Sequence, residues 1–178
     1  MICRARGMKG SSVSLVALAF ATLASLAGCG GGGSSSPSPA APPMSYTPPA
    51  PGLYSNRTLA VGAVTRHFDY YVPPGLPEQA PLLVLLHGGG QNKTQVIDGS
   101  TGSSGWRDVA EERKFLLLIP NGTDANGDTN AVTASWNDCR SDQVTGSTQD
   151  DVAFIAALID WALQRPEFRL DPARIYVT

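Results

Sequence analysis

The sequence is poor in the residues that build metal sites and disulfide frameworks. Its 178 residues include two histidines and three cysteines, with neither a Cys-x-x-Cys pair nor a histidine cluster. No such pair or cluster suggests a metal site, so we predict no bound metal, and we expect no cofactor. Cys3 and Cys29 precede the segment that can fold, so Cys139 stands alone. Cys139 is either a small buried thiol or the partner of a cysteine outside these residues.

The sequence also lacks an excess of positive charge and an apolar run long enough to span a bilayer. Its 13 basic residues face 15 acidic ones, which disfavours nucleic acid as a partner. The first ten residues carry three basic side chains and no acid, and a short apolar stretch, Val13–Ala27, follows them. This order is typical of an export signal rather than a spanning helix. Without these three basic residues the chain has 10 basic and 15 acidic residues, a net charge near −5.

The predicted signal ends in Leu26-Ala27-Gly28-Cys29, which resembles the lipobox of bacterial lipoproteins. The resemblance implies cleavage before Cys29 and acylation of its thiol, so residues 1–28 are the expected lipoprotein signal peptide. The alternative is ordinary cleavage after Ala27.

Residues 29–51 consist mostly of Gly, Ser, Pro and Ala, a composition that predicts a tether. We therefore expect an exported protein. We expect it either to be anchored by lipid on Cys29 to a membrane, at the cell surface or in the periplasm, or to be extracellular.

Residues 52–178 are expected to hold the globular domain, which is organised around Pro81–Asn92. A run rich in Leu and Val there predicts a buried parallel strand, whose carboxyl end leads into a site. The polar loop that follows consists of His87, Gly88, Gly89, Gly90 and Gln91. Glycines leave backbone N–H groups uncovered, so this loop can donate hydrogen bonds to a developing negative charge. We predict an oxyanion-binding loop; the alternative is a glycine turn without function.

An antiparallel hairpin is predicted before this loop. Its strands are Thr58–Val61 and Val64–Val72, with a turn at Gly62-Ala63. Alternation along the second strand places His67 on the face opposite Phe68. We interpret His67 as a surface histidine, because no nucleophile or orienting acid is suggested near it.

After the loop, the pattern predicts a helix over Gly105–Lys114, a buried strand over Phe115–Ile119 that ends at Pro120-Asn121-Gly122, and a long polar loop over Thr123–Ser147. Alternating Asp and Asn residues in that loop faintly resemble a calcium loop. Its glycine is misplaced and the final glutamate is missing, so we interpret the segment as turns. The candidates to line a substrate cleft are Trp106, Trp136 and Asn137. Trp106, which lies on the predicted helix, is also a candidate core residue.

The last elements are a helix and a strand. Thr148-x-x-Asp151 matches a capping box, and Val152–Leu163 is apolar nearly all round, which predicts a largely buried helix. Ile175–Thr178 is a third short strand. Strands that alternate with helices after an antiparallel hairpin predict an α/β fold, with a parallel strand-helix-strand-helix-strand arrangement.

The stretch from Arg66 to Thr178 resembles the amino-terminal half of an esterase family within the α/β-hydrolase fold. This family includes extracellular polyhydroxybutyrate depolymerases and feruloyl or acetylxylan esterases. The residues that carry the resemblance are Tyr71-Val72-Pro73, Pro81 to Gly90, Gly105-Trp106, Pro120-Asn121-Gly122-Thr123, Trp136-Asn137, Asp150-Asp151-Val152-x-Phe154 and Asp171-Pro172-x-Arg174-Ile175-Tyr176-Val177-Thr178.

The resemblance implies hydrolysis of carboxylic esters without a cofactor, on a polymer or plant cell-wall substrate. A serine attacks the ester carbonyl, a histidine moves the proton, an aspartate orients the histidine, and the loop at Gly88 to Gln91 supplies one oxyanion donor. In this family a Gly-x-Ser-x-Gly elbow follows the strand that here ends at Thr178, and the sequence contains no such motif.

We therefore expect residues 52–178 to be an incomplete α/β-hydrolase domain without a catalytic triad. Two functions stay open. One is a secreted or surface-anchored serine esterase represented here by its amino-terminal half, so that this chain by itself is inactive. The other is a non-catalytic lipoprotein remnant or binding module.

Overall fold

The computed structural model describes residues 45–98, 105–138 and 147–178, and Tyr46–Thr178 belongs to one compact unit. The predicted signal peptide, Cys29 and Cys139 lie outside the described residues. Within the described ranges, no helix has the length and apolar character needed to cross a membrane. The elements are β1 (Gly52–Val61), β2 (Val64–Val72), β3 (Leu82–Val84), α1 (Lys93–Asp98), α2 (Trp106–Arg113), β4 (Leu116–Pro120), α3 (Asp151–Leu163) and β5 (Ile175–Val177).

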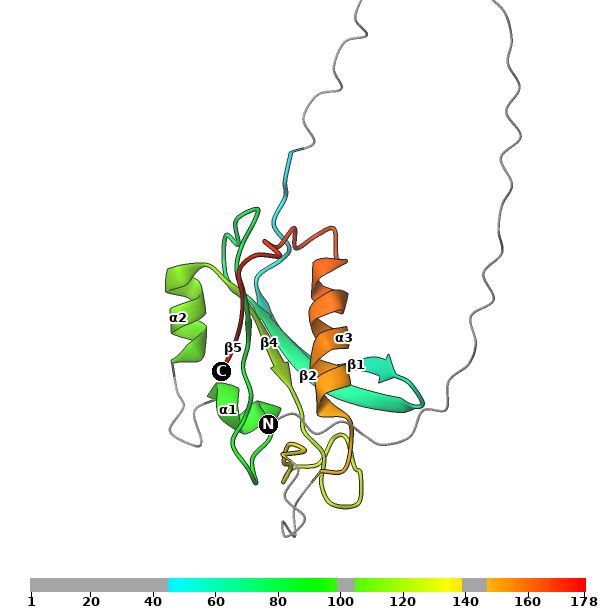
Figure 1. Cartoon of the computed structure of the whole chain (residues 1–178). Helices are drawn as coiled ribbons and strands as arrows, with labels where there is room; N and C mark the ends of the chain where they lie inside the picture. Colours follow the sequence, from blue (N-terminus) through cyan, green and yellow to red (C-terminus); the bar gives the residue numbers. More distant parts are fainter. Residues whose placement is uncertain (1–44, 99–104, 139–146) are drawn as a thin grey trace, which may run out of the picture. The chain divides into compact units, whose positions relative to one another are not determined.

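The strands form one mixed sheet in the order β1-β2-β4-β3-β5 (Figure 1). The hairpin strands β1 and β2 pair antiparallel, and β2 also runs antiparallel to β4. The remaining neighbours are parallel, because β3 pairs with β4 on one side and with β5 on the other. The predicted α/β fold, an antiparallel hairpin followed by parallel strands and helices, is confirmed.

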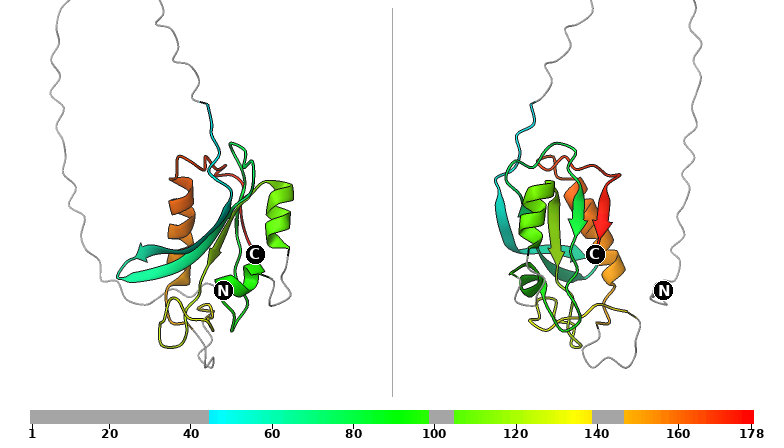
Figure 2. Two further views of the ribbon diagram at one scale, coloured as in Figure 1. Left: turned by 180° about the vertical axis from the view of Figure 1, so that it is seen from behind. Right: turned by 90° about the vertical axis from the view of Figure 1, so that its left-hand side faces the viewer.

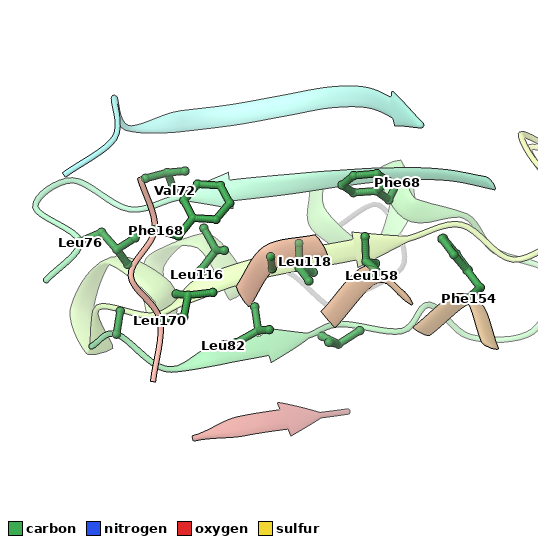
Figure 3. Close-up of a cluster of buried hydrophobic side chains, with 13 residues drawn as sticks. Phe68, Val72, Leu76, Leu82, Leu116, Leu118, Phe154, Leu158, Phe168 and Leu170 are labelled. Atoms are coloured by element: carbon green, nitrogen blue, oxygen red, sulfur yellow. The ribbon is translucent and has the colours of Figure 1, made fainter. Parts of the chain in front are cut away.

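Helices cover both faces of the sheet, with α2 on one face and α3 on the other (Figure 2). Alternation along each strand divides the core accordingly. In β4, Leu116 and Leu118 face α3 and pack with Phe154 and Leu158 (Figure 3). Leu117 and Ile119 face the other way and pack in the cluster on the α2 side. A helix on each face explains why β4 is buried along its whole length.

Two features of α3 correct the sequence-based prediction. Its N-cap is Asp150, whose Oδ1 accepts the N–H of Ala153 at 2.9 Å, so the predicted Thr148-x-x-Asp151 capping box is wrong. Its apolar residues are also not buried all round. Phe154, Leu158 and Ala162 face the sheet, whereas Val152 is 57% exposed.

Candidate functional site

The loop after β3 uses most of its backbone donors internally. The N–H of Gly88 donates to Oε1 of Gln91 at 3.0 Å, and the N–H of Gln91 donates to the carbonyl of Gly88 at 3.1 Å. The N–H of Gly90 donates to the carbonyl of Ala134 at 2.9 Å. Gly89 is exposed, and its N–H has no hydrogen-bond partner among the described residues. Of the four residues from Gly88 to Gln91, only Gly89 therefore presents a free donor at the carboxyl end of the parallel strand.

His87 holds this loop through both ring nitrogens. Nδ1 lies 2.8 Å from the carbonyl oxygen of Gly88, and Nε2 lies 2.9 Å from the backbone N of Gly122. A carbonyl only accepts and an N–H only donates, so the ring is neutral with its proton on Nδ1. The indole N–H of Trp136 donates to the carbonyl of His87 at 2.8 Å, and the centres of the two rings are 4.7 Å apart. These contacts fix the direction in which the glycine loop leaves β3.

The chemistry of His87 follows from its surroundings. The side chain is buried, and burial lowers its pKa below the ordinary 6.5, against the smaller opposing effects of the Gly88 carbonyl and Asp151. The neutral ring has no free nitrogen with which to take a proton from a nucleophile. His87 is therefore a positioning residue. The other histidine, His67, is bonded through Nδ1 to Oγ1 of Thr129 at 3.0 Å, so neither histidine pairs with a serine in the described part of the chain.

Gly122, in the loop after β4, lies too close to its neighbours for any side chain. A Cβ on this residue would be 2.3 Å from the carbonyl oxygen of Ser135 and 3.2 Å from Nε2 of His87. The same segment is fixed by a pair of backbone bonds, in which Thr123 and Ser135 exchange their N–H groups and carbonyls at 3.1 and 2.9 Å. Glycine is thus required here by close approach of the backbone.

Asn121 joins three parts of the chain at the same edge of the sheet. Its Oδ1 accepts the N–H of Lys93 at 3.0 Å, and its Nδ2 donates to the carbonyl of Ala131 at 3.1 Å. Its own N–H donates to the carbonyl of His67 at 2.9 Å. The sequence places this residue in the turn that ends a strand and in a motif of the family resemblance, and assigns its side chain no role. Its polar side chain directly after a fully apolar strand was the signal of a buried hub.

A buried ion pair positions the segment that carries Trp136 and Asn137. Nη2 of Arg66, on β2, lies 2.6 Å from Oδ1 of Asp151, the first residue of α3. Oδ2 of Asp151 accepts the N–H of Asn137 at 2.6 Å. The guanidinium also lies 4.2 Å from the ring centre of Phe154. No local pattern predicts a pairing of Arg66 with Asp151, because 85 positions separate them.

The structure brings some of the predicted site residues together and leaves one apart. Trp136 lies beside the glycine loop through its bond to His87, whereas Asn137 is bonded to Asp151 at the start of α3. Trp106, at the start of α2, packs against the core cluster on the α2 face. An open, almost wholly apolar groove of about 390 Å³ runs from Trp136 along the exposed side of α3. It is lined by Leu86, Trp136, Asp151, Val152, Ile155, Ala156 and Ile159.

The Asp and Asn residues of the long loop form turns, as predicted. Oδ1 of Asp124 accepts the N–H groups of Asn126 and Asp128 at 2.9 and 2.8 Å. Oδ1 of Asp128 accepts the N–H of Asn130 at 2.9 Å. The carboxylates thus bind backbone donors of their own segment.

Comparison with known proteins gives no family from the sequence. No protein-family model matches the chain, and no curated protein matches it. Among solved structures, it is similar to one described as the complex of a pOPH variant and pNPB, with a TM-score of 0.48 and 16% identity. The match covers 74% of this chain and 44% of that chain, so this chain spans less than half of its length. A likeness of this extent transfers no activity to the chain.

Proposed function

We propose that this chain supplies the oxyanion loop and the amino-terminal part of the sheet of a serine hydrolase that acts on carboxylic esters. The proposed enzyme is exported and has the α/β-hydrolase fold, and its substrates are polyhydroxyalkanoate, feruloyl or acetyl esters. The observation that carries it is the N–H of Gly89. This donor is exposed and unpaired among the described residues, and the donors on both sides of it are already bonded.

The physical reason is preorganisation. Attack on an ester carbonyl places negative charge on its oxygen, and a donor held in position lowers that barrier without reorganising at the moment of reaction. Removing one such donor typically costs about 100- to 1000-fold in kcat. His87 and Gly122 restrain the backbone on one side of Gly89, and the Gly90–Ala134 bond restrains it on the other.

The loop by itself forms no covalent bond. His87 has both ring nitrogens engaged, and the sequence contains no Gly-x-Ser-x-Gly elbow. The nucleophilic serine, the base and the acid are therefore proposed to come from polypeptide beyond these residues, and the 178-residue chain is proposed to be inactive.

The test compares the 178-residue chain with the product of the longest reading frame that contains it. The chain should not react with a fluorophosphonate probe, whereas the longer product should be labelled on a serine and should hydrolyse p-nitrophenyl butyrate. In that product Gly89→Pro, which removes the N–H, should lower kcat about 100-fold. Gly89→Ala is the matched control, because a Cβ there meets nothing within 4 Å. Stoichiometric labelling of the 178-residue chain, or equal kcat in both variants, would contradict the proposal.

A further inference from the structure

A second cleft lies between the hairpin and the carboxyl-terminal end of α3, and it does not depend on the proposed function. Its volume is about 340 Å³, within the range of small-molecule sites. It is lined by Asn56, Arg57 and Thr58 of β1, Phe68 and Tyr70 of β2, Trp161 of α3, and Arg165 and Glu167 in the segment that follows α3. Trp161 and Asp151 are ten residues apart on α3, about 15 Å at 1.5 Å per residue, so the cleft is separate from the glycine loop.

A β-bulge places a guanidinium in this cleft. Tyr54 pairs with Tyr70, but the next pair toward the hairpin turn joins Arg57, rather than Asn56, to Phe68. Directly opposed residues share a face of the sheet, so the bulge puts Arg57 on the same face as the two tyrosines. Without it, the polar but neutral Asn56 would occupy that position.

The bulge is held by buried charges. Asn56 has a φ of 55°, a conformation that non-glycine residues seldom adopt. Its N–H donates to Oδ1 of Asp69 at 2.8 Å, and its Oδ1 accepts Nζ of Lys93 at 3.1 Å. Asp69 and Lys93 themselves form a buried ion pair at 3.3 Å. Asparagine adopts this left-handed conformation more readily than other non-glycine residues, and these bonds hold the bulge, and with it the direction of Arg57, in place.

The side chains that line the cleft carry a net positive charge. Arg57 forms no ion pair with any described residue; its guanidinium lies 5.6 Å from the ring centre of Tyr54. Arg165 lies 4.8 Å from the ring centre of Trp161 and makes only a 3.9 Å contact with Glu167, the one carboxylate among the lining residues. Two guanidiniums therefore face one carboxylate, and an anion would be attracted.

The wall of the cleft is aromatic and offers a hydroxyl donor. The rings of Tyr70 and Trp161 lie 5.5 Å apart, and Phe68 packs edge-on against Trp161 at 4.9 Å. The hydroxyl of Tyr70 has no hydrogen-bond partner among the described residues. Its pKa is raised, by burial first, while Arg57 and Arg165 act in the opposite direction. The phenol is therefore protonated at neutral pH, and Tyr70 lines the same cleft as Arg57 and Arg165.

From these observations we propose that the cleft binds a small planar carboxylate of the size of benzoate. The carboxylate is bound by Arg57, Arg165 and the hydroxyl of Tyr70, and the flat body lies against Tyr70 and Trp161. Charge-assisted hydrogen bonds from guanidinium to carboxylate are strong and directional, whereas a flat ring gains from contact with aromatic side chains.

The test is a titration of the protein with sodium benzoate, followed by the indole N–H signals of the three tryptophans in NMR spectra. The Trp161 signal, assigned with Trp161→Phe, should shift saturably with a Kd on the order of 1 mM, and the Trp106 and Trp136 signals should not. Arg57→Gln and Arg165→Gln should each raise the Kd about tenfold. Arg113→Gln is the control and should leave the Kd unchanged, since this side chain is 72% exposed on α2.

Three comparison ligands decide the chemistry. Benzamide, which is planar and neutral, should bind at least about tenfold more weakly than benzoate. Cyclohexanecarboxylate should also bind more weakly, because its ring is not planar. Inorganic phosphate should bind more weakly because it has no ring to contact the aromatic side chains. Benzamide binding equal to that of benzoate, phosphate binding as tight, or an unchanged Kd in a folded Arg57→Gln protein would overturn the proposal.

Discussion

Nε2 of His87 and the backbone N–H of Gly122 meet at 2.9 Å and join the loops that follow two neighbouring parallel strands. The bond exists only while Nε2 is unprotonated, because a protonated nitrogen cannot accept an N–H. The geometry of the glycine loop is therefore linked to the ionisation of one buried ring.

This link predicts a loss of stability in mild acid. The pKa of folded His87 is below its unfolded value of 6.5, so the unfolded state binds more protons as the pH falls through this window. The free energy of unfolding should therefore decrease as the pH falls from about 6.5 through the folded pKa. Urea unfolding at a series of pH values between about 7.5 and 5 measures this decrease. His87→Phe should cost about 1–3 kcal/mol at pH 7.5, because it leaves a buried N–H unpaired, and should flatten the profile. Parallel profiles for the two proteins would show that His87 does not cause the loss of stability in acid.

Gly122 should tolerate no side chain. Gly122→Ala places a Cβ 2.3 Å from the carbonyl oxygen of Ser135, and the required shift should cost about 2–3 kcal/mol. Gly89→Ala is the matched control in the neighbouring loop and should change stability by less than about 0.5 kcal/mol. Thermal or urea unfolding of both variants gives the comparison. Equal stability of the two variants would show that the backbone at Gly122 and Ser135 has room for a side chain.

Removing only one partner of the Arg66–Asp151 ion pair should strongly lower the free energy of unfolding. Asp151→Asn leaves a guanidinium that is 2% exposed without its counter-charge, which should cost about 3–5 kcal/mol. Arg66→Met combined with Asp151→Asn should recover part of that loss, since no buried charge is left unpaired. A double-mutant cycle by urea unfolding measures the coupling. Purely additive effects would mean that the pair does not act as a unit.

Cys29 is predicted to carry the lipid. Cys29→Ala should abolish palmitate incorporation and release the protein from the membrane fraction or leave its signal uncut. The control is Cys139→Ala, which should be labelled like the unaltered protein. Equal radiolabelled palmitate in the unaltered protein and Cys29→Ala would refute acylation at this residue.

Much of the fold follows from local patterns. β2 has the predicted bounds, Val64–Val72, because alternation and the turn at Gly62, with a φ of 60°, fix its register and its end. The apolar strand Leu116–Pro120 and the helix Trp106–Arg113 also agree with the prediction to within a residue or two at their ends.

Other elements were missed for identifiable reasons. The six-residue helix α1 is too short for a periodic pattern, although Asn92 Oδ1 accepts the N–H groups of Thr94 and Gln95 as an N-cap does. β1 begins at Gly52 rather than Thr58, because a bulge interrupts the alternation.

The sequence predicts only part of the candidate site. The glycine loop could be located from its composition, but the one unpaired donor could not, since it depends on the bonds of Gly88 to Gln91 and of Gly90 to Ala134. The roles of His87 and Asn121 likewise depend on partners that come close only in the folded chain.

The glycine loop holds one free donor, the N–H of Gly89, between bonded neighbours. Amide hydrogen exchange of the 178-residue protein, resolved by residue with NMR, measures this difference between neighbouring N–H groups. The N–H groups of Gly88, Gly90 and Gln91 should be protected, and that of Gly89 should exchange close to the rate of an exposed amide. Uniform fast exchange across Gly88 to Gln91 would show a loop without preorganised geometry, and protection of Gly89 would show that its donor is already engaged. Either result would contradict a preorganised oxyanion donor at Gly89.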